Sequence, residues 1–191
     1  MKLLLVGLLC FTLTACNENK EPSIDLKDKV NVVMNVSNYG EVTIELDPSI
    51  APITVENFVN LVNDGFYDGL TFHRVITGFM VQGGDPSANG TGGSGVNIKG
   101  EFNSNGIQNN LSHTRGVISM ARSNDPNSAS SQFFIMHQDS PHLDGNYAAF
   151  GKVTNGIEII DAICNDSIVE DGNGTVAKEN QIKIESIKII Q

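Results

Sequence analysis

The chain has 191 residues and carries 22 acidic against 12 basic side chains, a formal net charge of −10 at pH 7. This length suits a single domain, and the excess of negative charge opposes binding to polyanions such as DNA, RNA or an acidic lipid surface. We therefore expect no nucleic-acid partner. Since 40% of the residues are hydrophobic and only 18% are charged, the composition fits neither a disordered chain nor a bundle of membrane helices.

The N-terminal segment has the layout of a secretory signal peptide. Lys2 precedes an apolar run at residues 3–13, which is shorter than the roughly 20 residues that span a bilayer. The sequence Leu-Thr-Ala-Cys at positions 13–16 resembles the lipobox of bacterial lipoproteins, in which the cysteine is lipidated and becomes the mature N-terminus. This resemblance implies a signal peptide at residues 1–15, lipidation at Cys16, export, and anchoring to a bacterial cell envelope, facing the periplasm. A plain signal peptide that contains a cysteine is the alternative.

Residues 16–29 are polar and charged, and we expect them to form a flexible tether to a folded domain at residues 30–191. The domain opens with two β-branched runs, 30–36 and 41–46. The short polar segment between them contains Gly40, and the arrangement is typical of a β-hairpin.

Two amphipathic helices are expected farther along the chain. The first begins near Pro52 and ends before Gly65. Its apolar side chains recur at helical spacing at Val55, Phe58, Val59 and Val62. The second helix lies at residues 156–164. Further strands are predicted at 71–76, 79–83, 116–121, 132–136, 148–153 and 182–190. Many short strands separated by Gly and Asn turns favour a sandwich or closed barrel over a parallel α/β sheet.

Three other patterns do not support a function. Residues 90–95 satisfy G-x-G-x-x-G, but no helical pattern follows them, so a surface loop is the better interpretation than a dinucleotide site. The four histidines show neither zinc-protease spacing nor a supporting cysteine cluster, so we expect no metal site and histidines that are exposed or at the edge of the core. No serine lies in a G-x-S-x-G elbow, so the residues do not support hydrolysis.

The candidate site begins in residues 72–85, where an arginine and a glutamine stand among large apolar side chains on two adjoining predicted strands. Alternation along the first strand predicts that Phe72, Arg74 and Ile76 share one face. On composition alone, ordinary core residues and an arginine paired with a carboxylate are the simpler interpretation.

Three spaced motifs together resemble the cyclophilins, the cyclosporin-type peptidyl-prolyl isomerases. The motifs lie at 72–85, at 116–122 with 131–135, and at 143–145 with 150–153. The resemblance runs from about residue 32 to residue 190, and the Met-Ala-Arg sequence at 120–122 is similar to the bacterial subgroup. It implies a mainly β fold, a closed eight-stranded antiparallel β-barrel capped by two α-helices.

The resemblance also assigns roles to single residues. Arg74 corresponds to the family's catalytic arginine. The other residues of the catalytic group are Phe79, Gln82 and Phe134. The substrate-binding residues are His73, Met80, Ala121, Arg122, His142, Leu143 and Tyr147. Three positions depart from the common family pattern: Thr77 stands where proline is frequent, Tyr147 where histidine occurs in many eukaryotic members, and His142 where tryptophan is common. The change at His142 implies weak cyclosporin binding.

The implied activity is cis–trans isomerisation of X-Pro peptide bonds, which needs no nucleophile, metal or cofactor. Rotation about a peptide bond meets a barrier of about 18–20 kcal/mol. An apolar pocket favours the twisted, less polar amide, and a guanidinium directed at the proline nitrogen stabilises its lone pair. The expected partners are proline-containing peptides and unfolded or secreted proteins, and the chain is expected to be a monomer. A proline-peptide binding chaperone module with little turnover is the alternative function.

Overall fold

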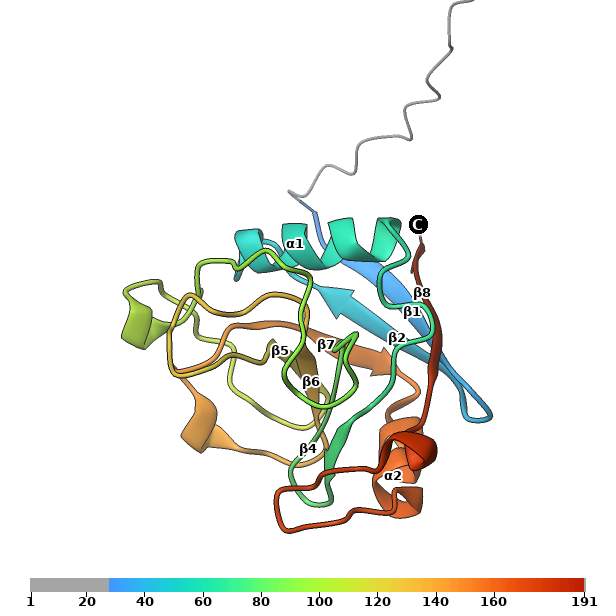
Figure 1. Cartoon of the computed structure of the whole chain (residues 1–191). Coiled ribbons are helices and arrows are strands. Elements are labelled where there is room, and N and C mark those ends of the chain that lie inside the picture. Colours follow the sequence, from blue (N-terminus) through green and yellow to red (C-terminus); the bar gives the residue numbers. More distant parts are fainter. Residues whose placement is uncertain (1–27, 191) are drawn as a thin grey trace, which may run out of the picture.

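The computed structural model describes residues 28–190 (Figure 1). The predicted signal peptide, Cys16 and nearly all of the predicted tether lie outside the described residues. Within residues 28–190 there are eight strands and two α-helices, together with three short 3₁₀ turns. The bounds are β1 Val30–Val36, β2 Gly40–Leu46, α1 Pro52–Asn63, β3 Arg74–Ile76, β4 Met80–Gly83, β5 Val117–Met120, β6 Phe133–Met136, β7 Ala149–Asn155, α2 Ile157–Asp166 and β8 Ile184–Ile190.

All eight strands form one antiparallel sheet in the order β3-β4-β6-β5-β7-β2-β1-β8, which curls strongly on itself (Figure 1). The two ends of the sheet meet where the segment that precedes β3 contacts the start of β8 and the residue before it. There the N–H of Gly69 donates to the Ile184 carbonyl and the N–H of Ile184 to the Leu70 carbonyl, both at 2.8 Å, and Thr71 bridges to Lys183. The predicted mainly β fold with eight antiparallel strands and two helices is confirmed. The sheet is a strongly curled half-barrel rather than the fully closed barrel that was expected, because these few contacts, and not a continuous ladder between β3 and β8, join its two ends.

The two helices cover opposite ends of the curled sheet (Figure 1). Helix α1 starts at Pro52, whose missing N–H is no loss in a first helical turn. It ends just before Gly65, which adopts a φ of +66° that favours glycine. The predicted inward side is confirmed, since Val55, Phe58 and Val62 are among its buried side chains.

An aromatic cluster forms the centre of the core between α1 and the sheet. The ring centroid of Phe58 lies 4.9 Å from that of Tyr67, 5.6 Å from that of Phe133 and 5.3 Å from that of Phe150. The buried hydroxyl of Tyr67 donates a 3.1 Å hydrogen bond to the Ser131 carbonyl, so its polar group is satisfied. Burial of one such large side chain stabilises the fold by about 1.5–3 kcal/mol. The cluster thereby fixes β6, whose opposite face points toward the candidate site.

Two expectations about side-chain placement are wrong. Phe72 does not share a face with Arg74; it is 1% exposed and packs in the main core. Strand β3 begins only at Arg74, so strict alternation does not extend back to Phe72. The histidines are also not mostly exposed, because His73, His113 and His137 are 4%, 1% and 9% exposed.

Candidate active site

The residues assigned to the site by sequence converge on a cavity of about 200 Å³ on the outer face of the β3–β4 hairpin. Its lining consists of Arg74, Phe79, Met80, Gln82, Ala121, Arg122, Phe134, Leu143 and Tyr147. Two predicted substrate-binding residues, His73 and His142, do not line it. We refer to this cavity as the apolar pocket, because Met80, Phe134 and Leu143 form its buried walls.

Strand register explains why distant residues meet in the apolar pocket. Arg74 on β3 pairs directly with Gln82 on β4, and Gln82 pairs with Phe134 on β6. Directly opposed residues of an antiparallel sheet point to the same face. The catalytic candidates Arg74, Gln82 and Phe134 therefore stand in one row across three strands.

A chain of hydrogen bonds holds the guanidinium of Arg74. Its Nε donates to the Asn173 carbonyl at 2.8 Å, and its Nη1 donates to Oε1 of Gln82 at 3.2 Å. The Nε2 of Gln82 then donates to Oε1 of Gln132 at 2.9 Å. Burial lowers the pKa of Arg74 from its ordinary value, but an arginine stays charged at neutral pH. The site thus presents a cation whose direction is fixed from two sides.

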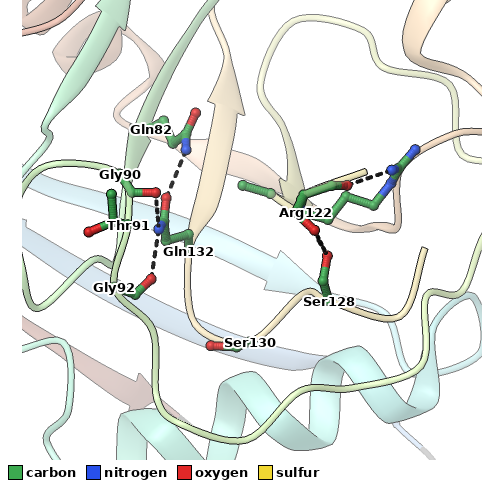
Figure 2. A pocket seen from close by; sticks show the side chains of 10 residues that line it. Gln82, Gly90, Thr91, Gly92, Arg122, Ser128, Ser130 and Gln132 are labelled. Carbon is green, nitrogen blue, oxygen red and sulfur yellow. Dashed lines mark hydrogen bonds between the residues drawn. The ribbon is translucent and has the colours of Figure 1, made fainter. Parts of the chain in front are cut away.

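Gln132 is a site residue that the sequence did not reveal. Its Nε2 donates to the carbonyls of Gly92 at 2.8 Å and Gly90 at 3.1 Å. Both belong to the glycine-rich loop, the segment that follows β4 and contains residues 90–95, and Figure 2 shows Gln132 between Gln82 and this loop. A polar side chain at the start of the apolar strand predicted at 132–136 was the available signal, because an amide beside a core strand needs hydrogen-bond partners. Gln132 connects the arginine to the glycine-rich loop.

The glycine-rich loop is built around the carboxylate of Asp85, which is fully buried. Asp85 accepts hydrogen bonds from the backbone N–H groups of Ser87 at 2.7 Å, Asn89 at 3.1 Å and Gly90 at 2.6 Å. Burial acts to raise the pKa of Asp85, but the backbone donors outweigh it and hold the pKa below its usual range. A Cβ on Gly92 would collide with Asp85, which explains the glycine there. The G-x-G-x-x-G pattern is a loop, as predicted, and its glycines permit packing on a carboxylate.

The main apolar wall, Phe134, is supported from behind by His113. The two rings stack with centroids 6.0 Å apart, and Tyr147 meets Phe134 edge-on at 5.7 Å. The Nδ1 of His113 lies 2.9 Å from Oδ1 of Asp144, and its Nε2 lies 3.0 Å from the hydroxyl of Ser119. Burial lowers the pKa of His113, although Asp144 acts in the opposite direction.

Ser119, His113 and Asp144 repeat the order of groups in a serine hydrolase, but Ser119 is fully buried in β5. A nucleophile must reach its substrate, so this trio is not a hydrolytic site. Its position behind Phe134 makes it a support for the apolar wall.

A second cavity of about 230 Å³ adjoins the apolar pocket and shares Gln82, Ala121 and Arg122 with it (Figure 2). Arg122 lines both cavities. Its guanidinium lies 5.1 Å from the ring centre of Phe102 and 4.8 Å from that of Tyr147, and its Nε donates to the Asn146 carbonyl at 3.0 Å. Its Nη1 also donates to the Ser123 carbonyl at 2.8 Å, so four contacts fix this side chain and it can form a defined wall for both cavities.

The two remaining predicted residues lie beside the pocket. His142 is exposed, and its ring stacks on Phe79 at 5.7 Å, so it reaches the pocket rim through that side chain. His73 is buried behind Arg74 and borders a different cavity, which Arg74 and Gln82 also line. Among residues 28–190, no cluster of three histidine, cysteine or acidic side chains is arranged to hold a metal ion.

The comparison with known proteins agrees with this geometry. A family model described as cyclophilin type peptidyl-prolyl cis-trans isomerase/CLD matches residues 31–189. Peptidyl-prolyl cis-trans isomerase B of Bacillus subtilis is 47% identical over 131 residues, which cover 69% of this chain and 88% of the relative. A Helicobacter pylori peptidyl-prolyl cis-trans isomerase is 46% identical over 136 residues, covering 70% of this chain and 80% of the relative.

Solved structures show the same fold. The crystal structure of a cyclophilin type peptidyl-prolyl cis-trans isomerase of Cryptosporidium parvum has a TM-score of 0.75 to this chain at 32% identity, covering 86% of this chain and 99% of that one. A structure of that isomerase in the presence of the dipeptide Ala-Pro has a TM-score of 0.73 at 34% identity, with 84% and 99% coverage. The chain therefore belongs to the cyclophilin-type peptidyl-prolyl cis-trans isomerases, and it is an enzyme that interconverts the cis and trans forms of X-Pro peptide bonds.

Proposed function

We propose that the apolar pocket takes the proline ring of a peptide substrate, with Arg74 directed at the proline nitrogen. Met80, Phe134 and Leu143 supply an apolar wall, and they are 1%, 5% and 8% exposed. The structure of the Cryptosporidium relative in the presence of the dipeptide Ala-Pro supports this assignment, since an X-Pro dipeptide is the smallest ligand that carries the reacting bond. The observation that carries the proposal is the row of Arg74, Gln82 and Phe134 across three paired strands.

The chemistry follows from what happens to an amide as it twists. Resonance between nitrogen and carbonyl is lost, so the nitrogen regains its lone pair and the carbonyl oxygen loses negative charge. The apolar wall favours that less polar state over the planar one, which is stabilisation of the transition state rather than of the substrate. The guanidinium of Arg74 donates to the nitrogen lone pair, and its bonds to Asn173 and Gln82 keep it oriented before the substrate arrives.

We also propose that the enzyme is a bacterial lipoprotein. The lipobox-like sequence ending at Cys16 supports export and attachment of acyl chains, each of which contributes about 0.8 kcal/mol per buried CH₂. Residues 16–29 then separate the isomerase domain from the membrane surface. Where the lipid is anionic, the negative charge of the chain, −10 for the full sequence, also repels the domain from that surface. No helix within residues 28–190 has the length and apolar character needed to cross a membrane. The expected clients are unfolded envelope or secreted proteins with X-Pro bonds.

Fractionation and intact-mass measurement of the native protein test the anchor. The wild-type chain is expected in the membrane fraction, with the mass of a lipidated chain that begins at Cys16. Cys16→Ser is expected to release the protein or to leave an uncleaved precursor, with isomerase activity on a short X-Pro peptide unchanged. An unmodified soluble wild-type chain would refute lipidation without affecting the isomerase assignment.

A further inference from the structure

A second polar cluster lies outside the apolar pocket, against helix α2. Its members are Arg115, His137 and Asp161. Arg115 donates to both carboxylate oxygens of Asp161, through Nη1 at 2.6 Å and Nη2 at 2.7 Å, and its Nη1 also donates to the His137 carbonyl at 2.9 Å. The Nε2 of His137 lies 3.2 Å from Oδ1 of Asp161. The three side chains therefore connect the end of β6 to α2.

The contacts of His137 identify which ring nitrogen carries the proton. The backbone N–H of Gly78 donates to Nδ1 at 2.9 Å, so Nδ1 must offer a lone pair. The proton of the neutral ring is then on Nε2, where it faces the carboxylate of Asp161. Arg115 balances the negative charge of Asp161. The carboxylate therefore accepts the Nε2 proton of a neutral imidazole and orients the ring so that Nδ1 accepts from Gly78.

His137 bonds to two neighbouring residues of the turn that joins β3 to β4, Gly78 through its side chain and Phe79 through its backbone. Its side chain accepts from the N–H of Gly78, and its backbone N–H donates to the carbonyl of Phe79 at 2.9 Å. A separate contact ties the same turn to α2, because the Thr77 hydroxyl donates to the Cys164 carbonyl at 2.8 Å. Phe79 directly follows Gly78 in this turn and lines the apolar pocket. The placement of Phe79 thus depends on a turn that is fastened from outside the pocket.

We propose that His137 is a positioning residue of the isomerase: by accepting the Gly78 N–H, it fixes the turn that presents Phe79 to the proline ring. Asp161 and Arg115 assist by keeping the imidazole in the required tautomer. This inference rests on the proposed role of the apolar pocket in binding proline. It assigns a part in substrate binding to a histidine that contacts neither the pocket nor the peptide.

Loss of the Gly78 contact affects geometry more than folding. Gly78 is exposed, so water can replace the imidazole as the acceptor for its N–H, and the turn keeps its other bonds. What water does not supply is a fixed direction for the turn, and Phe79 is then free to move from the pocket wall. Because Phe79 contacts the proline ring before and during rotation, the loss weakens binding of substrate and transition state alike. The expected signature is a raised KM with kcat nearly unchanged.

Two conservative variants separate the contacts of His137. In His137→Asn the amide oxygen can take the place of Nδ1 and accept from Gly78, but the side chain is too short to reach Asp161. In His137→Gln the longer side chain can reach Asp161 but has no acceptor at the Nδ1 position. For an X-Pro peptide we expect KM to rise about three- to tenfold in His137→Gln, with kcat within about twofold of wild type, while His137→Asn stays within about twofold in both constants.

Nuclear magnetic resonance supplies a readout that does not depend on any variant. The ¹⁵N signals of wild-type His137 at neutral pH should show an unprotonated Nδ1 and a protonated Nε2. The opposite tautomer would overturn the proposal outright. In His137→Gln the Gly78 amide proton should shift, as expected for a lost acceptor.

Two further variants identify which idea fails if one does. Val42→Ala removes buried apolar volume on β2, away from the turn, and should lower Tm without changing KM. Equal increases in KM for Val42→Ala, His137→Asn and His137→Gln would mean that loss of stability, and not positioning, causes the effect. Phe79→Ala should raise KM at least as much as His137→Gln. If Phe79→Ala has no effect, the proposed pocket is wrong; if only Phe79→Ala has an effect, the role of His137 is wrong.

Discussion

Arg74 and Gln82 are directly opposed on β3 and β4, and the Nη1 of Arg74 donates to Oε1 of Gln82 at 3.2 Å. Gln82 in turn is held by Gln132, whose own amide is bound to two carbonyls of the glycine-rich loop. The direction of the cation is therefore set by a series of contacts that ends at the buried carboxylate of Asp85. Preorganisation of this kind lets a charge act on the transition state without reorganisation during the reaction.

Substitution of the arginine tests its catalytic role. We expect Arg74→Ala to lower kcat/KM on an X-Pro peptide by about 10²- to 10³-fold, the usual effect of removing one transition-state donor. Arg74→Lys is the matched control, since it retains the charge but not the planar fork that bonds to both Gln82 and Asn173. Turnover close to wild type in a folded Arg74→Ala enzyme would contradict the assignment.

The apolar wall can be tested with two adjacent phenylalanines on opposite faces of β6. Phe134→Ala should weaken peptide binding and also lower stability, because truncation of a buried aromatic side chain costs about 3–5 kcal/mol. Phe133→Ala should lower Tm to a similar degree without changing KM, since Phe133 lies in the aromatic core and not in the pocket. Leucine at the same two positions provides the comparison if the alanine variants do not fold. Unchanged peptide affinity in a folded Phe134 variant would remove that residue from the pocket.

His113 should make the protein sensitive to acid. Burial lowers its pKa in the folded state below the ordinary value of 6.5, despite the opposing effect of Asp144. Between that lowered pKa and 6.5 the unfolded chain binds a proton that the folded chain does not, so stability is present above about pH 6.5 and declines as the pH falls. His73, whose pKa burial also lowers, acts in the same direction.

Thermal unfolding measured between about pH 7 and pH 5 checks this dependence. Wild-type Tm should fall on acidification, and His113→Asn should reduce the slope even though it lowers Tm at neutral pH. A slope that is the same in His113→Asn and wild type would show that other groups cause the decline.

The exposed ring of His142 should limit inhibition by cyclosporin. It stacks on Phe79 at the rim of the pocket, at 5.7 Å, where a tryptophan would offer more apolar surface and an indole N–H. We expect weak inhibition of the wild-type enzyme and an improvement of about tenfold, or about 1.4 kcal/mol, in His142→Trp. The inhibition constants of the two enzymes on the same peptide decide this point; tight inhibition of the wild type, or no gain in the variant, would be the contrary result.

Much of the fold was determined by local patterns in the sequence. The hairpin of β1 and β2 and the inward side of α1 were predicted from spacing alone, because the two- and 3.6-residue periods arise from backbone geometry. The pocket residues required more than periodicity, and they were assigned through three motifs that resemble the cyclophilins. The structure brings together all of them except His73 and His142.

Only the tertiary structure decided which polar groups meet. Gln82 contacts Gln132, His113 contacts Asp144, and His137 contacts Asp161, although the members of each pair are far apart in the sequence. A side chain's capacity for hydrogen bonds limits the type of partner but not its position, and position depends on the order of strands in the sheet. The position of the apolar residue Phe72 was likewise decided by tertiary structure. Pairing with β4 makes β3 begin at Arg74, so Phe72 lies outside the strand and packs in the core. Local periodicity describes a residue's own element, whereas contacts between elements are fixed only when the sheet curls and brings its distant segments together.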